Sequence, residues 1–147
     1  MLNSYMKTTE LNGAIIELPE DAMPASESLP FSVPDPSVRV FVPCLPLNTE
    51  GVNFSAISAW TQYPIKVLWS NRIPHEDIKQ FERELLRRMV TANYNPEKDY
   101  VIMMGPPLGV AAFFLALSSH YEFEHVNILI YKKTTNRYGA ARLTGGS

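Results

Sequence analysis

The chain has 147 residues, 46% apolar and 19% charged, and its 13 basic and 15 acidic side chains give a net charge of −2. This composition is typical of one soluble domain with a proper core, and the charge gives no electrostatic support for binding nucleic acid. A single cysteine excludes a disulfide framework and a thiolate metal cluster. The first ten residues lack a signal-peptide pattern and no apolar run has the length of a membrane span, so we expect a protein of a reducing cytoplasm without membrane contact.

Residues 1–37 differ from the rest of the chain in charge and proline content. They carry one lysine and six acids, a net charge of −5, against +3 for residues 38–147, and seven of the 12 prolines lie in the first 50 residues. We therefore expect an extended acidic arm ahead of an α/β domain that spans residues 38–147. Within the arm, residues 14–18 predict a short edge strand or a segment added to another sheet. A disordered leader is the alternative.

From residue 38 onward, strand-like and helix-like segments alternate. Short β-rich runs predict strands at residues 38–42 and 65–69, and an unbroken apolar run predicts a strand covered on both faces at residues 100–104. Residues 126–131 complete the alternation as another strand. Residues 137–143 fit an antiparallel edge strand. The pattern predicts a three-layer, Rossmann-like α/β domain whose mostly parallel sheet has about four strands plus that edge strand.

Three helical segments separate the predicted strands. Residues 54–60 have apolar positions spaced for one or two turns, and residues 110–121 read as a buried, apolar helix. Pro74 opens the most regular helix, with acidic residues in its first turn. Its core-facing positions recur at helical spacing and are Ile78, Phe81, Leu85 and Met89.

The turn between the third strand and the apolar helix is the strongest candidate for a ligand site. Ligands gather at the carboxyl ends of strands in such sheets, and anions gather at helix amino termini. The turn has no Lys, Ser or Thr, and its two prolines have no N–H groups, so a packing role is the main expectation. The alternative is that a nucleotide or another anionic ligand binds at Gly105, Pro106, Leu108 and Gly109.

Two segments are candidates for contacts with proteins. One is the apolar run of the arm, with Ile15, Ile16 and Leu18, and the other is the basic carboxyl-terminal segment, with Lys132, Lys133, Arg137, Tyr138 and Arg142. The arm's charge of −5 and the tail's +4 nearly balance. This favours contact between them, within one chain or between neighbouring chains, over binding of a polyanion. We therefore expect a protein partner or self-association through the arm.

No residue set predicts catalysis or a metal site. His120 and His125 lie close to two glutamates, but their spacing matches no ligand pattern and suits a polar loop. Cys44 follows the first core strand without an evident base, which favours a buried thiol over a nucleophile. We therefore expect a binding protein rather than an enzyme, and no cofactor is implied. A hydrolase or nuclease is a third interpretation.

Residues 38–143 resemble a group of small proteins encoded by tailed phages. The shared pattern is an acidic residue and a tyrosine opening an apolar strand, a glycine turn, an apolar helix, and a strand followed by basic and tyrosine-containing sequence. Here it is found in residues 99–105, 110–117, 127–132 and 136–138. With the arm and the lack of a catalytic set, this predicts a non-enzymatic phage protein, either a virion or assembly component or a modulator of a host protein, located in the host cytoplasm or the virion.

Overall fold

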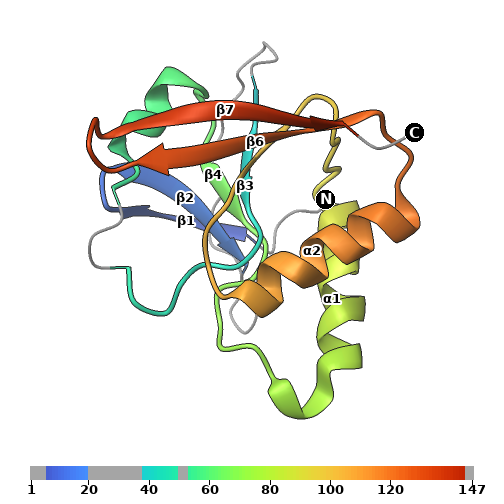
Figure 1. Cartoon of the computed structure of the whole chain (residues 1–147). Coiled ribbons are helices and arrows are strands. Elements are labelled where there is room, and N and C mark those ends of the chain that lie inside the picture. Colours follow the sequence, from blue (N-terminus) through green and yellow to red (C-terminus); the bar gives the residue numbers. More distant parts are fainter. Residues whose placement is uncertain (1–5, 20–37, 50–52, 145–147) are drawn as a thin grey trace.

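The computed structural model describes residues 6–19, 38–49 and 53–144, and these form one α/β unit (Figure 1). Residues 1–5 and 20–37 of the predicted acidic arm lie outside the described residues. No helix within the described part is long and apolar enough to cross a membrane.

A seven-stranded sheet in the order β1-β2-β4-β3-β5-β6-β7 forms the centre of the fold. The five inner strands are parallel to one another, and each outer strand is antiparallel to its neighbour. The strands are β1 (Met6–Leu11), β2 (Ala14–Pro19), β3 (Val40–Val42), β4 (Ile65–Val67), β5 (Tyr100–Ile102), β6 (His125–Lys132) and β7 (Arg137–Thr144). The α/β class and the antiparallel strand at the carboxyl end are confirmed, but the sheet is larger than predicted.

The additional strands come from the amino-terminal segment that the sequence places in an arm. Asn12 and Gly13 have φ angles of 49° and 94°, which suit a two-residue hairpin turn, so β1 folds back onto β2. β2 then pairs with β4. The expectation of an edge strand at residues 14–18 is therefore wrong, because β1 covers the outer side of β2.

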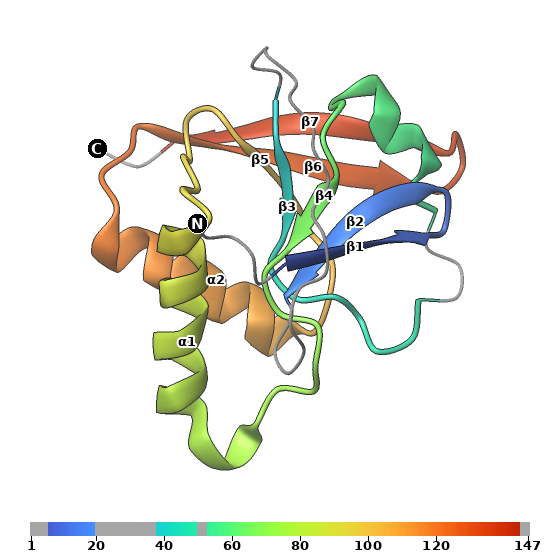
Figure 2. The ribbon, with the colours of Figure 1, turned by 180° about the vertical axis from the view of Figure 1, so that it is seen from behind.

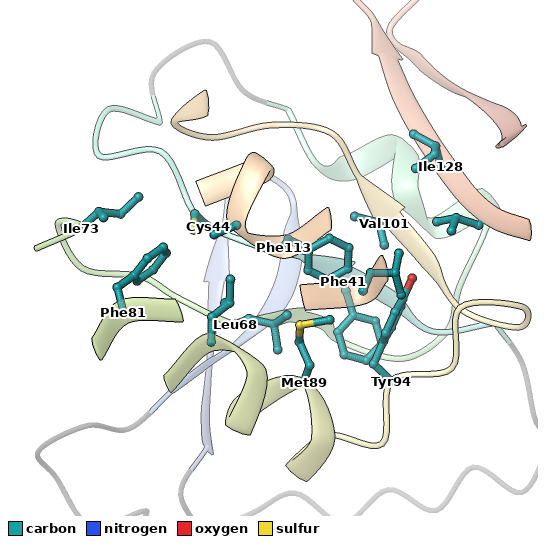
Figure 3. Close-up of a cluster of buried hydrophobic side chains, with 14 residues drawn as sticks. Phe41, Cys44, Leu68, Ile73, Phe81, Met89, Tyr94, Val101, Phe113 and Ile128 are labelled. Atoms are coloured by element: carbon teal, nitrogen blue, oxygen red, sulfur yellow. The ribbon is translucent and has the colours of Figure 1, made fainter. Parts of the chain in front are cut away.

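Both α-helices pack on one side of the sheet, where they contact each other (Figures 1 and 2). They are α1 (Ile78–Thr91) and α2 (Pro107–His120). Residues that alternate along the strands, such as Phe41, Val101 and Ile128, join Phe81 and Phe113 of the helices in one core cluster (Figure 3). We call this side of the sheet the helix side.

The opposite side of the sheet is covered differently. Val40, Val42 and Ile65 point to this side and pack with Phe54 and Ile57. Ile57 belongs to the short 3-10 helix η1 (Ser55–Ala59), which is all that the predicted turns at residues 54–60 form. The three predicted layers thus become, in the described ranges, one α-helical layer, the sheet and this 3-10 turn.

The start of α1 differs slightly from the prediction. The acidic residues after Pro74 form a separate 3-10 turn, η2 (His75–Asp77), and α1 begins at Ile78. Asp77 caps it by accepting a hydrogen bond from the Gln80 backbone N–H at 3.1 Å. The predicted core positions Phe81, Leu85 and Met89 are fully buried.

Candidate functional site

The strand order reverses between β3 and β5, and this is where a ligand is expected. The chain leaves β3 toward β4, on one side, and leaves β5 toward β6, on the other. In open parallel sheets, ligands bind in the crevice outside the carboxyl ends of two such strands. Here the segment after β3, with Cys44, meets the turn after β5, which runs from Gly105 to Gly109.

Cys44 fills this crevice. A Cβ atom on Gly105 would lie 2.1 Å from the Cys44 carbonyl oxygen, and one on Gly109 would lie 2.3 Å from the Cys44 Sγ. Gly105 also has a φ of 106°, which other residues rarely adopt. Both glycines are therefore required for the close approach of the two loops, and Gly109 itself is buried.

The amino terminus of α2 has few N–H groups left for an anion. Pro106 and Pro107 have none, and the N–H groups of Gly109 and Val110 donate to the Pro106 carbonyl at 3.0 and 3.2 Å. A ligand at Gly105, Pro106, Leu108 and Gly109 remains a prediction. The contacts around these residues favour the main expectation, a packing role for the turn.

The thiol of Cys44 lies in a poor environment for a nucleophile. Burial raises its pKa to about 12, although the positive charge of Arg88 opposes the shift. A thiol with such a pKa is almost entirely protonated at neutral pH, and the thiolate is the reactive form. Within residues 6–19, 38–49 and 53–144, no group of three or more His, Cys, Asp or Glu residues could hold a metal ion.

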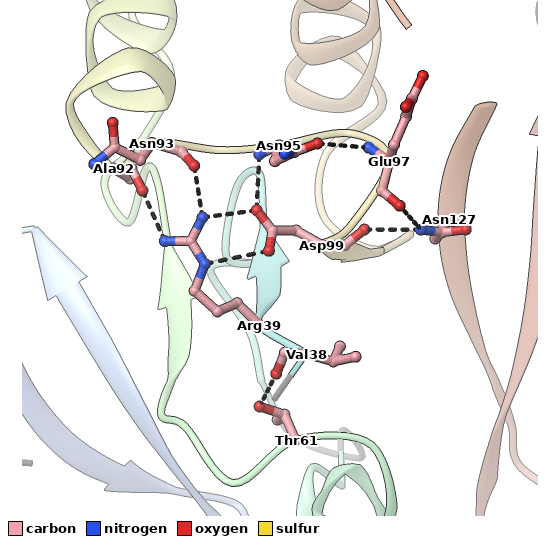
Figure 4. Close-up of polar contacts among 9 residues, drawn as sticks. All are labelled: Val38, Arg39, Thr61, Ala92, Asn93, Asn95, Glu97, Asp99 and Asn127. Atoms are coloured by element: carbon pink, nitrogen blue, oxygen red, sulfur yellow. Dashed lines mark hydrogen bonds and ion pairs between the residues drawn. The ribbon is translucent and has the colours of Figure 1, made fainter. Parts of the chain in front are cut away.

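A polar network lies at the other end of the sheet, where β3 and β5 begin (Figure 4). The Arg39 guanidinium donates two hydrogen bonds to the carboxylate of Asp99, at 2.8 and 3.2 Å. It also donates to the carbonyls of Ala92 and Asn93, at 2.9 and 2.6 Å, where its charge suits the end of α1. The network therefore joins the end of α1 to the sheet. Asp99 is 4% exposed, so its carboxylate is almost inaccessible to solvent.

Sequence reasoning missed this pair, although a signal was present. Arg39 lies at the start of one predicted strand, and Asp99 immediately precedes another. The starts of neighbouring parallel strands lie together, so opposite charges there predict an ion pair once the strand order is known.

The candidate interaction residues fall into two groups. Ile16 and Tyr138 are core residues, at 0% and 5% exposure, and the Tyr138 hydroxyl donates to the Asn53 carbonyl at 3.0 Å. Arg142 is tied to Asn127 by a hydrogen bond of 3.3 Å. The exposed residues are Ile15 at the β1–β2 hairpin, Lys132, Lys133 and Arg137 at the tip of the β6–β7 hairpin, and Arg142 itself, while Leu18 is partly buried.

An exposed apolar surface around α2 was not predicted. Eight large apolar side chains are exposed in the described ranges. Two of them belong to α2, two lie on β6 and β7 at positions that alternate toward the helix side, and one directly follows β5. We call these five the α2 surface: Met103, Leu108, Leu115, Ile130 and Leu143. The sequence predicted a buried helix here because α2 is apolar all round, so the only signal was the absence of a polar face.

Comparison with known proteins gives no identification. No protein-family model, no curated protein and no solved structure matches the chain. The resemblance to tailed-phage proteins therefore depends only on the residues quoted for it, and the function must be argued from the structure itself.

Proposed function

We propose that this protein is non-enzymatic and acts by binding another protein chain through the α2 surface. The observation that carries the proposal is the outward stripe of α2. Leu108, Ala111 and Leu115 recur at helical spacing and are exposed, Leu115 at 55%. α2 contains no Asp, Glu, Lys or Arg, and a helix that is apolar on all sides is normally buried on all sides.

The other helix of the same fold is built differently. The exposed positions of α1 include Lys79, Arg83 and Arg87, and Val90 is its single large apolar residue at an exposed position. Glu84 pairs with Arg87 along this face. The outer face of a helix in this fold can thus be charged. A cluster of exposed apolar side chains on a soluble domain marks an interaction site.

Binding of a nucleotide or another anionic ligand at the Gly105–Gly109 turn is the competing proposal. The crevice where it would bind holds Cys44, and the helix amino terminus has little donor capacity left. No observation favours this alternative specifically. One part of our proposal is supported by the sequence resemblance alone. It is the role as a virion or assembly component, or as a modulator of a host protein.

The proposal is tested by placing a photo-crosslinking amino acid at position 115 or at position 90 in the expressing cells. Both sites are exposed on a helix, Leu115 at 55% and Val90 at 58%. We expect a defined crosslinked protein from position 115 and none from position 90. Equal, diffuse labelling from both positions would refute the proposal, and so would a nucleotide-dependent rise in melting temperature.

A further inference from the structure

We infer that the partner at the α2 surface is a second copy of this chain, bound through β7 and α2 in a two-fold symmetric dimer. This inference rests on the proposed function and names its partner. β7 is an outermost strand whose eight residues are all paired with β6 without a bulge. Its outer backbone groups have no hydrogen-bond partner within the described ranges, and such an edge is a template for another strand.

β7 has few of the features that prevent pairing, and these are the charges of Arg137 and Arg142. It contains no proline, and its central residues are Gly139, Ala140 and Ala141, whose small side chains leave the backbone open to approach. The other outer strand, β1, has six residues and lies beside a single exposed apolar residue, Ile15. The edge next to the α2 surface is therefore the better candidate, rather than the amino-terminal segment.

Two-fold symmetry connects the strand edge to the apolar surface. A strand that pairs with its own copy about an axis perpendicular to the sheet runs antiparallel to it, and each side of the sheet continues into the same side of the partner. The helix sides of both copies are then continuous across the joint. Leu143, 53% exposed, lies on β7 on this side, so main-chain pairing also covers this member of the α2 surface.

Charge at the two ends of the β6–β7 hairpin agrees with this arrangement. The tip carries Lys132, Lys133 and Arg137, and the opposite end is preceded by the exposed Glu122 and Glu124, next to the start of β6. Antiparallel pairing brings the basic tip of one copy to these two glutamates of the other, which share that end of the hairpin with Arg142. Such complementarity favours this orientation and speeds association.

The test is the solution mass of the full-length chain by light scattering and sedimentation equilibrium over a range of concentrations. We expect a reversible dimer in the wild type. Leu115→Glu and Leu143→Glu each place a charge in the joint and should weaken the dimer by about 10-fold or more. Val90→Glu, a matched change on α1, should dimerise like the wild type, and circular dichroism should show that all variants are folded.

Hydrogen exchange tests the strand edge directly. Alternate amides of β7 that point away from β6 should gain protection at concentrations where the dimer forms, and Leu115→Glu should lose this gain. A wild type that stays monomeric would overturn the dimer, as would a dimer with unchanged β7 exchange or one that Val90→Glu weakens equally. A monomer whose position 115 still crosslinks to a different protein would overturn the dimer while retaining the proposed function, whereas absence of both would refute both.

Discussion

Replacing Gly109 with alanine tests whether the crevice between β3 and β5 is closed. An alanine in an open helix position is favoured over glycine by about 1 kcal/mol. Here the added Cβ would lie 2.3 Å from the Cys44 Sγ, 2.9 Å from the Cys44 Cβ and 3.3 Å from the Ile73 Cδ1. Overpacking of a core costs about 1–3 kcal/mol, and two contacts under 3.0 Å place this site in the upper part of that range, at about 2–3 kcal/mol. Subtracting the gain of about 1 kcal/mol in helix propensity, we expect Gly109→Ala to lower the free energy of unfolding by about 1–2 kcal/mol.

A second substitution makes the test specific to Cys44. Cys44→Ala alone removes a buried sulfur and should cost about 1 kcal/mol. In the double variant the new methyl group occupies space that the sulfur vacates, and the main remaining overlap is between the two Cβ atoms. The double variant should therefore be about 1–2 kcal/mol more stable than the sum of the single effects implies.

Urea unfolding followed by tryptophan fluorescence and circular dichroism measures these free energies. Ala111→Gly, at an exposed position of α2, is the control, because it reports helix propensity without a close neighbour and should cost about 1 kcal/mol. If Gly109→Ala is as stable as the wild type, or if the two substitutions are additive, α2 can move away from Cys44 and the crevice is open.

Three further outcomes follow from buried or paired groups. Because burial raises the pKa of the Cys44 thiol to about 12, a thiol reagent at pH 8 should react with the folded chain at the rate of unfolding, and immediate reaction would show an accessible thiol. The Tyr94 hydroxyl is buried without a partner in the described structure, so Tyr94→Phe should be neutral or raise the free energy of unfolding by up to about 1 kcal/mol, and a loss would indicate a missing partner. The hydrogen bond from Arg87 lowers the pKa of Glu84 below its ordinary 4.5; its stabilisation is present above pH 4.5 and is lost as pH falls through the lowered pKa, so wild-type stability in acid titrations should fall more steeply than that of Glu84→Gln.

Several features of the fold were predicted correctly because they depend on local sequence. The spacing of Phe81, Leu85 and Met89 identified the buried face of α1, since helical period and burial are properties of one segment. Apolar runs likewise located the inner strands. β1 was missed because it has no apolar run, although its two threonines favour a strand and Asn12-Gly13 is a hairpin signal.

The candidate site shows where local information ends. The sequence placed a glycine turn after a strand and before a helix, and the structure has it there. Whether such a turn holds a ligand depends on what lies opposite it, and Cys44 is 61 residues before Gly105 in the chain. Nor does the sequence indicate which face of an apolar helix meets the core. The α2 surface could therefore be identified only from the tertiary structure, which shows the face of α2 that packs against the core.

The sequence by itself thus determined the secondary structure of the inner sheet and of the two helices, because periodicity and turn chemistry act within a few residues. The strand order was decided only in the tertiary structure, since pairing joins segments far apart in the chain. That order brings Arg39 to Asp99 and Cys44 to the glycine turn. It also leaves β7 at the edge of the sheet, while Leu115 of α2 stays exposed.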